Sequence, residues 1–203
     1  SVPPDGVAWA MDRILDDQAT SAQIAAFVTA LRVRGESPEH VRALVDSMME
    51  RAVLIDPEQR PSVVVDVVGT GGDGSNSVNI STMTALVVAA AGAPVIKHGN
   101  RAASSATGSA DALEALGARI ELSGAAVAAC TREVGIGFCF APAFHPALRF
   151  AGPTRRELGV PTVFNVAGPL ANPARPEAML VGCARAESAP VMAQVLADRG
   201  VSV

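Results

Sequence analysis

The chain has 203 residues, of which 49% are hydrophobic and 18% are charged, and its formal net charge is -4. This composition supplies enough apolar material for a buried core in one or two domains, and it excludes a general nucleic-acid binder and a polybasic membrane-surface protein. The most apolar stretch, residues 85–96, is too short to span a bilayer, and the first residues lack a signal-peptide pattern, so we expect a cytoplasmic protein.

The three cysteines, Cys130, Cys139 and Cys183, lie far apart in the sequence. They are odd in number, and their spacing lacks the pairs that are typical of a zinc site or a redox motif. We therefore expect buried thiols in a reducing compartment.

Up to about residue 58 the hydrophobic pattern predicts helices. Thr20 and Gln23 have the spacing of a capping box, and Gly35 is expected to end the helix that they begin. Ser37 followed by Pro38 predicts another helix start, because the hydroxyl can cap free amides and proline suits the first helical position. The apolar stripes of the three predicted helices are Val7, Met11, Ile14 and Leu15, then Ile24, Phe27, Val28 and Leu31, and then Val41, Leu44, Val45 and Met48. This region carries no cluster of candidate catalytic side chains in its sequence and is interpreted as a small bundle or an interface.

The following sequence alternates between short β-branched runs and helical segments. The predicted strands are residues 63–68, 94–97, 135–142, 161–165 and 178–184, and the predicted helices are residues 81–92, 109–117, 124–135 and 188–200. This alternation predicts an α/β fold with a mostly parallel sheet that is covered by helices on both faces. Ligands of such sheets bind beyond the carboxyl ends of the strands, so the loops after the strands are the place to look for a site.

We place the domain boundary at residue 60, so that residues 1–60 form an all-helical domain and residues 61–203 form the α/β domain. Only Pro57 and Pro61 mark this boundary. The chain starts with Ser1 instead of methionine and ends on residues 201–203, which look like the beginning of another strand. We therefore expect a fragment of a longer polypeptide, with part of the chemistry outside it.

A glycine-rich loop, with Gly69, Gly71, Gly72 and Gly74, joins the first predicted strand to a helix that begins near Asn79. Glycines permit positive φ and bring backbone amides close to a ligand, and a helix N-terminus adds free N–H groups, so this combination suits phosphate. The loop is neither a dinucleotide-binding fingerprint nor a P-loop. A tight connection without a ligand is the alternative reading.

A second polar cluster follows the second predicted strand. Lys97, His98, Asn100 and Arg101 place three potentially cationic side chains and an amide within five residues, where they can face the same crevice as the glycine loop. A lone histidine is more often structural than catalytic, but its place in this cluster favours a site. Asp111, near the next helix start, can equally do no more than complement the helix dipole.

Three segments, residues 66–82, 97–117 and 140–174, together closely resemble the anthranilate phosphoribosyltransferase family, the class IV phosphoribosyltransferases of tryptophan biosynthesis. They occur in the family's order, and the resemblance extends from the helical start to about Cys183. It implies a small helical domain that forms a homodimer interface and a larger phosphoribosyl-donor domain, with the active site in the cleft between them. It also implies transfer of the phosphoribosyl group of PRPP to the amine of anthranilate, the second step of tryptophan biosynthesis.

The resemblance also assigns roles to individual residues. The residues expected to bind PRPP are Gly69, Gly71, Gly72, Asp73, Asn79, Ser81, Thr82, Lys97 and Asn100. Ser81 would contribute to a Mg²⁺ site. The residues expected to line the anthranilate site are Gly69, His98, Asn100, His145, Arg155, Gly168 and Pro169. Arg155 would recognise the carboxylate, because a guanidinium binds a carboxylate through two parallel hydrogen bonds. From the residues alone, a solvated helix charge beside Arg156 and Glu157 is the favoured reading of Arg155.

The implied reaction displaces pyrophosphate from the anomeric carbon of ribose by an aryl amine, which is a weak nucleophile. We expect a dissociative, oxocarbenium-like transition state that needs positioning and charge stabilisation but no single catalytic residue. The chain departs from the family pattern in three ways. The acidic pair that binds magnesium in the family is expected beyond the segment present, so this chain alone is expected to bind PRPP poorly or not to catalyse. Thr107 stands where serine is common in the family. Leu148 stands where a larger side chain is common.

Two alternatives stay open at this stage. A pyrimidine nucleoside phosphorylase has a related fold, but its loop normally carries a lysine after the glycines, where this chain has Ser75 and Asn76. A non-catalytic relative that binds nucleic acid should have a basic surface, whereas this chain has 16 Lys and Arg residues against 20 Asp and Glu residues. We expect small-molecule substrates, with no nucleic acid or membrane as a partner.

Overall fold

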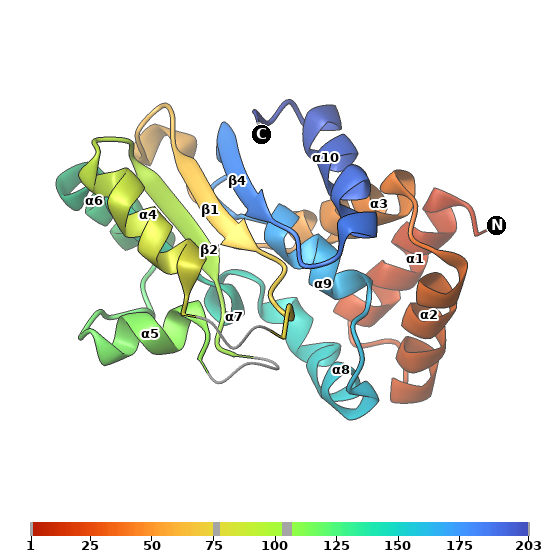
Figure 1. Cartoon of the computed structure of the whole chain (residues 1–203). Coiled ribbons are helices and arrows are strands. Elements are labelled where there is room, and N and C mark those ends of the chain that lie inside the picture. The colour runs from red at the N-terminus through yellow and green to blue at the C-terminus, as the bar shows by residue number, and fades with distance from the viewer. Residues whose placement is uncertain (1, 75–77, 103–106, 203) are drawn as a thin grey trace.

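The computed structural model describes residues 2–74, 78–102 and 107–202. Figure 1 shows three N-terminal helices on one side and a sheet with its own helices on the other, while α9 and α10 lie between them. The expected α/β architecture with an N-terminal helical region is confirmed.

The N-terminal helices are α1 (Pro4–Leu15), α2 (Ser21–Arg34) and α3 (Pro38–Glu50). Both predicted helix starts are confirmed: the Thr20 hydroxyl accepts the N–H of Gln23, and the Ser37 hydroxyl accepts the N–H of His40. Gly35 caps the end of α2 with a φ of 83°, which residues other than glycine rarely adopt. Local sequence therefore sets the ends of these helices.

Within residues 2–74, 78–102 and 107–202, the N-terminal helices have no core of their own. Their buried apolar stripes join one cluster that also contains Val68 and Met179 from the sheet and Val195 from α10. Fully burying one aliphatic side chain of this kind stabilises a fold by roughly 1.5–3 kcal/mol. α3 is in contact with α10, and α2 with α8. The helical region and the sheet are thus held together by shared hydrophobic burial.

The sheet contains β1 (Val65–Gly69), β2 (Val95–Gly99), β3 (Ile136–Phe140) and β4 (Ala178–Gly182) in the spatial order β3-β2-β1-β4. All three strand pairings are parallel, as predicted. The carboxyl ends of the strands therefore meet along one edge, and the arrowheads of β1 and β4 point to the same side in Figure 1.

Helices cover both faces of the sheet. α4 (Ile80–Ala90) packs its Ala85 against Val67 and Val95 on one face, and α5 (Ser109–Ala115) covers the β3 end of that face. α6 (Gly124–Val134) packs Val127 against Ile96 on the other face. The remaining helices are α7 (Ala141–Phe144), α8 (Gly152–Leu158), α9 (Val163–Ala167) and α10 (Ala189–Asp198), with 3-10 turns η1 (Pro57–Gln59), η2 (Pro146–Phe150), η3 (Gly168–Leu170) and η4 (Ala186–Ser188).

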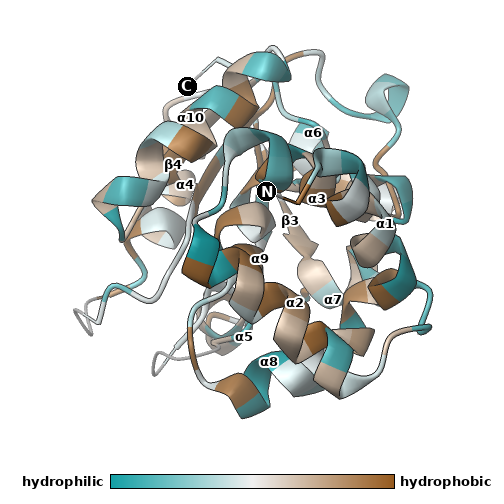
Figure 2. Ribbon diagram, turned by 90° about the vertical axis from the view of Figure 1, so that its right-hand side faces the viewer, coloured by the Kyte–Doolittle hydropathy of each residue, from teal (hydrophilic) through white to brown (hydrophobic). Residues whose placement is uncertain are grey.

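The strand predicted for residues 161–165 is wrong, because this segment forms the start of α9. The N–H of Thr162 donates to Oδ1 of Asn165, which begins the helix. Thr162, Val163 and Phe164 are all buried, and for a short run that is buried at successive positions periodicity cannot distinguish a helix from a strand. Figure 2 shows α9, largely hydrophobic, beside α2 and α8.

Two other expectations are only partly right. Cys139 is buried, but Cys130 and Cys183 are half-buried, so the expectation of three buried thiols holds for one of them. The strand-like chain end makes one parallel bridge, between Ser202 and Ala178 at the outer edge of β4. None of the helices in the described residues has the length and apolar composition that crossing a membrane requires.

Candidate active site

The glycine loop leaves β1 at the carboxyl edge of the sheet. Gly71, Gly72 and Gly74 have φ values of 63°, 71° and 68°, a region in which side chains are strained. A Cβ added at any of the three would meet no atom of the described residues within 4 Å, so crowding by these residues does not explain the glycines. They are needed for the backbone path of the loop. Ser75 and Asn76, on which the phosphorylase alternative turned, lie outside the described residues.

The start of α4 adds polar groups next to this loop. Asn79 precedes the helix, and its Nδ2 donates to the Gly108 carbonyl at 3.3 Å, which joins the glycine loop region to the loop after β2. Thr82 is buried, and among the described residues its hydroxyl has no hydrogen-bond partner. A buried hydroxyl without a partner is costly, so Thr82 is suited to bind a ligand.

Lys97, on β2, is only 2% exposed. Its Nζ donates to the Val67 carbonyl at 2.5 Å and to the Ser81 hydroxyl at 3.1 Å. Burial lowers the pKa of Lys97, and the negative charge of Asp66 opposes that shift. The ion pairs found among the described residues do not include Lys97, so its positive charge is available to an anion in the loop.

His98 points to the opposite face of β2, because successive side chains of a strand alternate. Its ring centroid lies 5.2 Å from that of His145. Burial, then the neighbouring His145 and Lys97, lowers the pKa of His98 to about 3, and the Gly168 backbone opposes this shift. His98 is therefore neutral at pH 7, and the expectation that it is a candidate cation is wrong.

His145 also belongs to this buried pair. Its Nε2 lies 2.8 Å from the Ala171 carbonyl, and because a carbonyl only accepts hydrogen bonds, Nε2 carries the proton. Burial lowers the pKa of His145. Among the described residues, Nδ1 of His145 and Nε2 of His98 have no hydrogen-bond partner. The two imidazoles thus offer neutral, unpartnered nitrogens on the side of the sheet away from Lys97.

Arg155 on α8 is half-buried, with its guanidinium 4.8 Å from the centre of the Phe164 ring. Burial lowers its pKa, and no ion pair within the described part of the chain includes it. The alternative of a solvated helix charge is therefore wrong for Arg155, although Arg156 and Glu157 are exposed. A half-buried guanidinium without a carboxylate partner is suited to bind an anionic ligand.

The turn after α9 carries the last two predicted residues. Gly168 and Pro169 form the start of η3, and a Cβ added at Gly168 would meet nothing within 4 Å. Pro169 is buried. Phe164, on which Arg155 stacks, lies one helical turn before Gly168, so one short segment connects the guanidinium and the two histidines. Leu148, the departure from the family pattern, is half-buried and packs against the shared core.

The predicted polar cluster after β2 is split by the structure. Arg101 forms ion pairs with Asp111 and Glu114 and lies over the Phe140 ring, so its charge is already engaged. Asp111 accepts the N–H groups of Ala102 at 3.0 Å and Gly108 at 2.8 Å. Asp111 therefore joins the two ends of the loop after β2 and does more than complement a helix dipole. Asn100 is exposed at the start of that loop.

Sequence reasoning missed two buried polar residues. Asp66, near the start of β1, and Asn172, after η3, form a hydrogen bond of 2.8 Å across 106 positions of sequence. An aspartate inside an otherwise apolar run, residues 63–68, is a signal that could have been used, because a charge is rarely buried without a purpose. Nothing in the sequence around Asn172 identifies its partner.

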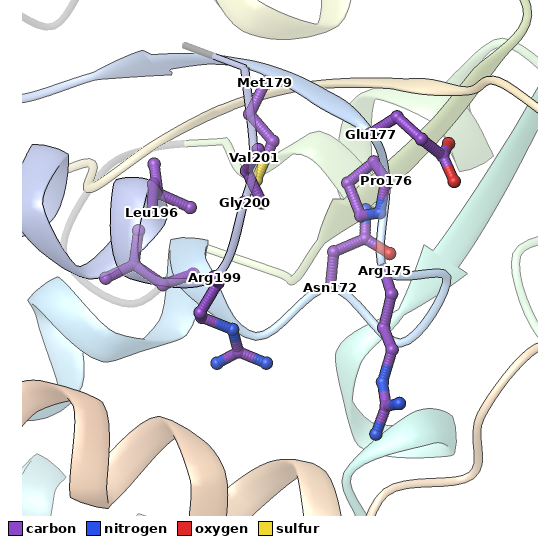
Figure 3. A pocket seen from close by; sticks show the side chains of 10 residues that line it. Asn172, Arg175, Pro176, Glu177, Met179, Leu196, Arg199, Gly200 and Val201 are labelled. Atoms are coloured by element: carbon purple, nitrogen blue, oxygen red, sulfur yellow. The ribbon is translucent and has the colours of Figure 1, made fainter.

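A cavity of about 490 Å³ lies elsewhere, near the amino end of β4. Figure 3 shows Arg175 and Arg199 among its lining side chains, together with Asn172. None of the predicted site residues lines it, and it lies at the other end of the sheet from the glycine loop. We therefore place the candidate site at the carboxyl edge and not in this cavity.

The described residues offer limited ligation for a metal. They contain no group of three or more His, Cys, Asp or Glu side chains that could hold an ion. The Ser81 hydroxyl can supply one neutral oxygen beside the loop. Mg²⁺ commonly keeps several waters and binds substrate phosphates with few protein ligands, so Ser81 fits as one ligand of a phosphate-bound ion.

Comparisons with known proteins agree with this geometry. The chain is 63% identical over 195 residues to an anthranilate phosphoribosyltransferase of Nocardia farcinica, covering 96% of the chain and 56% of that relative, and 63% identical over 200 residues to one of Rhodococcus opacus, covering 98% and 54%. The chain thus spans a little more than half the length of these relatives. The predicted resemblance to this family is confirmed.

Solved structures agree as well. The crystal structure of anthranilate phosphoribosyltransferase from Thermus thermophilus superposes with a TM-score of 0.91 at 43% identity, over 98% of this chain and 60% of that one. The enzyme of Saccharomyces cerevisiae in complex with PRPP and Mg gives a TM-score of 0.88 at 30% identity, over 98% and 59%. Residues 2–52 match the helical bundle domain and residues 61–202 the a/b domain of the glycosyl transferase family, and the chain therefore belongs to that family.

Proposed function

We propose that the polypeptide that carries this chain transfers the phosphoribosyl group of PRPP to the amine of anthranilate, releasing pyrophosphate. The observation that carries the proposal is the glycine loop, whose three positive-φ glycines lie between β1 and α4, while the buried ammonium of Lys97 donates to Val67 and Ser81 on either side of it. The names of the similar enzymes, and the yeast structure that contains PRPP and Mg, support the choice of substrates.

The donor would bind along the loop and the start of α4. Backbone N–H groups of Gly71, Gly72 and Asp73 approach phosphate without side-chain bulk, and the α4 N-terminus adds a favourable dipole. Lys97 supplies the positive charge, while Asn79, Thr82 and the exposed Asn100 supply hydrogen bonds. Mg²⁺, when bound to the pyrophosphate with Ser81 as a ligand, would neutralise negative charge on the leaving group.

The acceptor would bind on the other side of β2. Arg155 holds the carboxylate through its planar guanidinium, which Phe164 keeps in place by stacking. His98, His145, Gly168 and Pro169 surround the aromatic ring. Both imidazoles are neutral, so the carboxylate is attracted to Arg155 and not to the histidines, which sets the orientation of the amine.

The reaction needs no strong base in this site. The bond between the anomeric carbon and the pyrophosphate oxygen breaks, the oxygen keeps the electron pair, and the amine nitrogen forms the new bond to that carbon. His98, with its pKa lowered to about 3, is a poor proton acceptor, so the proton leaves the nitrogen to water after the bond has formed. Positioning and charge stabilisation supply the rate.

The proposal extends to the domain boundary, the oligomeric state and the location of the protein. We retain residue 60 as the boundary between a helical domain and a donor domain, a homodimer formed by the helical domain, and a cytoplasmic location. Trp9 and Val33 on the helical side are 63% and 82% exposed, and large exposed apolar side chains of this kind suit an interface.

The test is a fluorescence assay of anthranilate consumption by the full polypeptide, with PRPP and Mg²⁺ added. Arg155→Ala should raise the KM for anthranilate about 100-fold, because a buried guanidinium–carboxylate pair contributes about 3 kcal/mol. Arg156→Ala is the matched control, since Arg156 is exposed on the same helix, and it should leave the KM unchanged. A folded wild-type protein that consumes no anthranilate would refute the proposed function.

A further inference from the structure

Asp66 is a carboxylate at a costly position. It is the second residue of β1, between Val65 and Val67, and is fully buried, with 0% of its surface exposed. A buried carboxylate is tolerated only when its oxygens are hydrogen-bonded. Both oxygens of Asp66 have partners: Oδ1 accepts the His98 N–H at 3.2 Å and Oδ2 accepts Nδ2 of Asn172 at 2.8 Å.

Asn172 uses its polar atoms equally fully. It is 2% exposed, and its Nδ2 also donates to the Ile96 carbonyl at 2.8 Å. Its Oδ1 accepts the N–H of Ala174 at 2.8 Å. The pair of Asp66 and Asn172 therefore connects β1, β2 and the segment after η3 in one hydrogen-bonded network.

Both ends of this network lead to the candidate active site. On β2 it holds the backbone of His98, which separates Lys97 from Asn100. After η3 it holds the residue next to Ala171, whose carbonyl binds Nε2 of His145. The donor residues on β2 and the acceptor residues after α9 thus share one anchor.

The charge of Asp66 has a second effect. Lys97 lies on the neighbouring strand, pointing to the other face of the sheet, and Asp66 is the carboxylate that favours its charged form. In a buried environment this interaction is screened far less than at the surface. Removing the carboxylate would leave the Lys97 ammonium without that support.

We propose that Asp66 is a positioning residue, which through Asn172 and the His98 backbone holds the donor side and the acceptor side of the site in fixed relation. The inference rests on the proposed phosphoribosyl transfer. Asp66 itself touches neither substrate, so its effect must pass through the residues that it holds.

The first variant is Asp66→Asn in the full polypeptide. The new amide is nearly the same size, but its NH₂ group must face either the His98 N–H or Nδ2 of Asn172, both of which are donors. One hydrogen bond is lost, and the KM should rise about tenfold for PRPP and for anthranilate alike, because both sides share the anchor. A purely structural role would lower kcat with the folded fraction and leave both KM values unchanged.

The second variant exchanges the two groups, combining Asp66→Asn with Asn172→Asp. The amide at position 66 can then accept from the His98 N–H and donate to the carboxylate at position 172, which still accepts from Ala174. The Ile96 carbonyl, however, loses its donor and instead faces a carboxylate oxygen, which is an acceptor. The exchange should therefore recover only part of the loss in KM, but even a partial rescue is something that general destabilisation cannot produce.

Glu177→Gln is the matched control, because Glu177 also accepts hydrogen bonds within the fold, from Arg60 and the Val64 N–H, but outside the site. It should lower the melting temperature and leave both KM values unchanged. If Asp66→Asn does not fold, Asn172→Ala tests the inference in its place. This variant should raise the KM for anthranilate more than the KM for PRPP.

Unchanged KM values in Asp66→Asn, or no recovery in the exchanged variant, would overturn the inference while the wild type remains active. An inactive, folded wild type would instead refute the proposed function, and the positioning role with it. The two failures are therefore distinguished by the wild-type assay alone.

Discussion

The two sides of the candidate site are built in different ways. The donor side consists mainly of backbone: positive-φ glycines, the first turn of α4 and one buried ammonium. The acceptor side consists of side chains from distant segments, with Arg155 on α8, His98 on β2 and His145 after α7. A phosphate can thus be bound by one local loop, whereas an aromatic acid can be oriented only by side chains that tertiary packing brings together.

Lys97→Met gives the largest effect that this comparison predicts. Methionine fills the buried space but removes the charge and the donor to the Val67 carbonyl and the Ser81 hydroxyl. We expect kcat/KM for PRPP to fall about 100-fold, as when one stabilising donor is removed from an active site. The KM for anthranilate should change little, since Lys97 points away from the acceptor side. Steady-state kinetics with each substrate varied in turn measures both constants. An equal loss of kcat/KM for the two substrates would contradict the separation of a donor side from an acceptor side.

Gly71→Ala tests whether the donor side depends on backbone conformation. Its φ of 63° is strained for alanine, which should cost about 1 kcal/mol of unfolding free energy and displace the loop amides from phosphate. Gly117→Ala is the control, because Gly117 has a φ of 87° and equally open surroundings but lies outside the loop. Calorimetric titration with PRPP should show weaker binding for Gly71→Ala alone. Equal affinity in both variants would contradict the assignment of the loop.

A third prediction concerns pH and the acceptor side. The pKa of His98 is lowered from 6.5 to about 3. Between pH 3 and pH 6.5, His98 is therefore protonated in the unfolded chain but neutral in the folded chain. Above pH 6.5 His98 is neutral in both states and favours neither, and as the pH falls below 6.5 it lowers the free energy of unfolding by about 1.4 kcal/mol per pH unit at most. His145 acts in the same direction.

Asp66 acts in the opposite direction, because burial raises its pKa to about 6. The folded chain holds this proton more tightly, so the free energy of unfolding decreases as the pH rises from about 4 to 6. The charge of Asp66 also acts on Lys97, across the sheet, and on Cys139, where burial, followed by that charge, raises the pKa of the thiol. In urea unfolding between pH 4 and 7, His98→Gln should show a smaller gain of stability with rising pH than the wild type. Identical slopes would show that His98 titrates normally in the folded protein.

The parts of the molecule that sequence predicts well are those with local causes. Thr20 and Ser37 begin their helices through hydrogen bonds to residues three positions away. The glycines of the loop indicate by themselves that its backbone has positive φ values. Parallel strands follow from alternation of strand and helix, which also predicts the edge where the site lies.

The parts that could not be predicted depend on partners far away in the chain. The run at residues 161–165 is compatible with either a strand or a buried helix until its neighbours are known. From the sequence Arg155 is interpreted as a surface charge, because its contact with the Phe164 ring exists only in the folded structure. The bond between Asp66 and Asn172 spans 106 positions, and no local pattern indicates it.

The single core shared by the N-terminal helices and the sheet restricts how this protein can diverge. Because Val68, Met179 and Val195 pack in the same cluster as the apolar stripes of α1 to α3, the helical region cannot be exchanged for an unrelated module without exposing part of the sheet. Gene fusion or recombination near residue 60 would separate side chains that were selected together. Members of such a lineage should therefore inherit both regions as one unit, with compensating changes on either side of the contact.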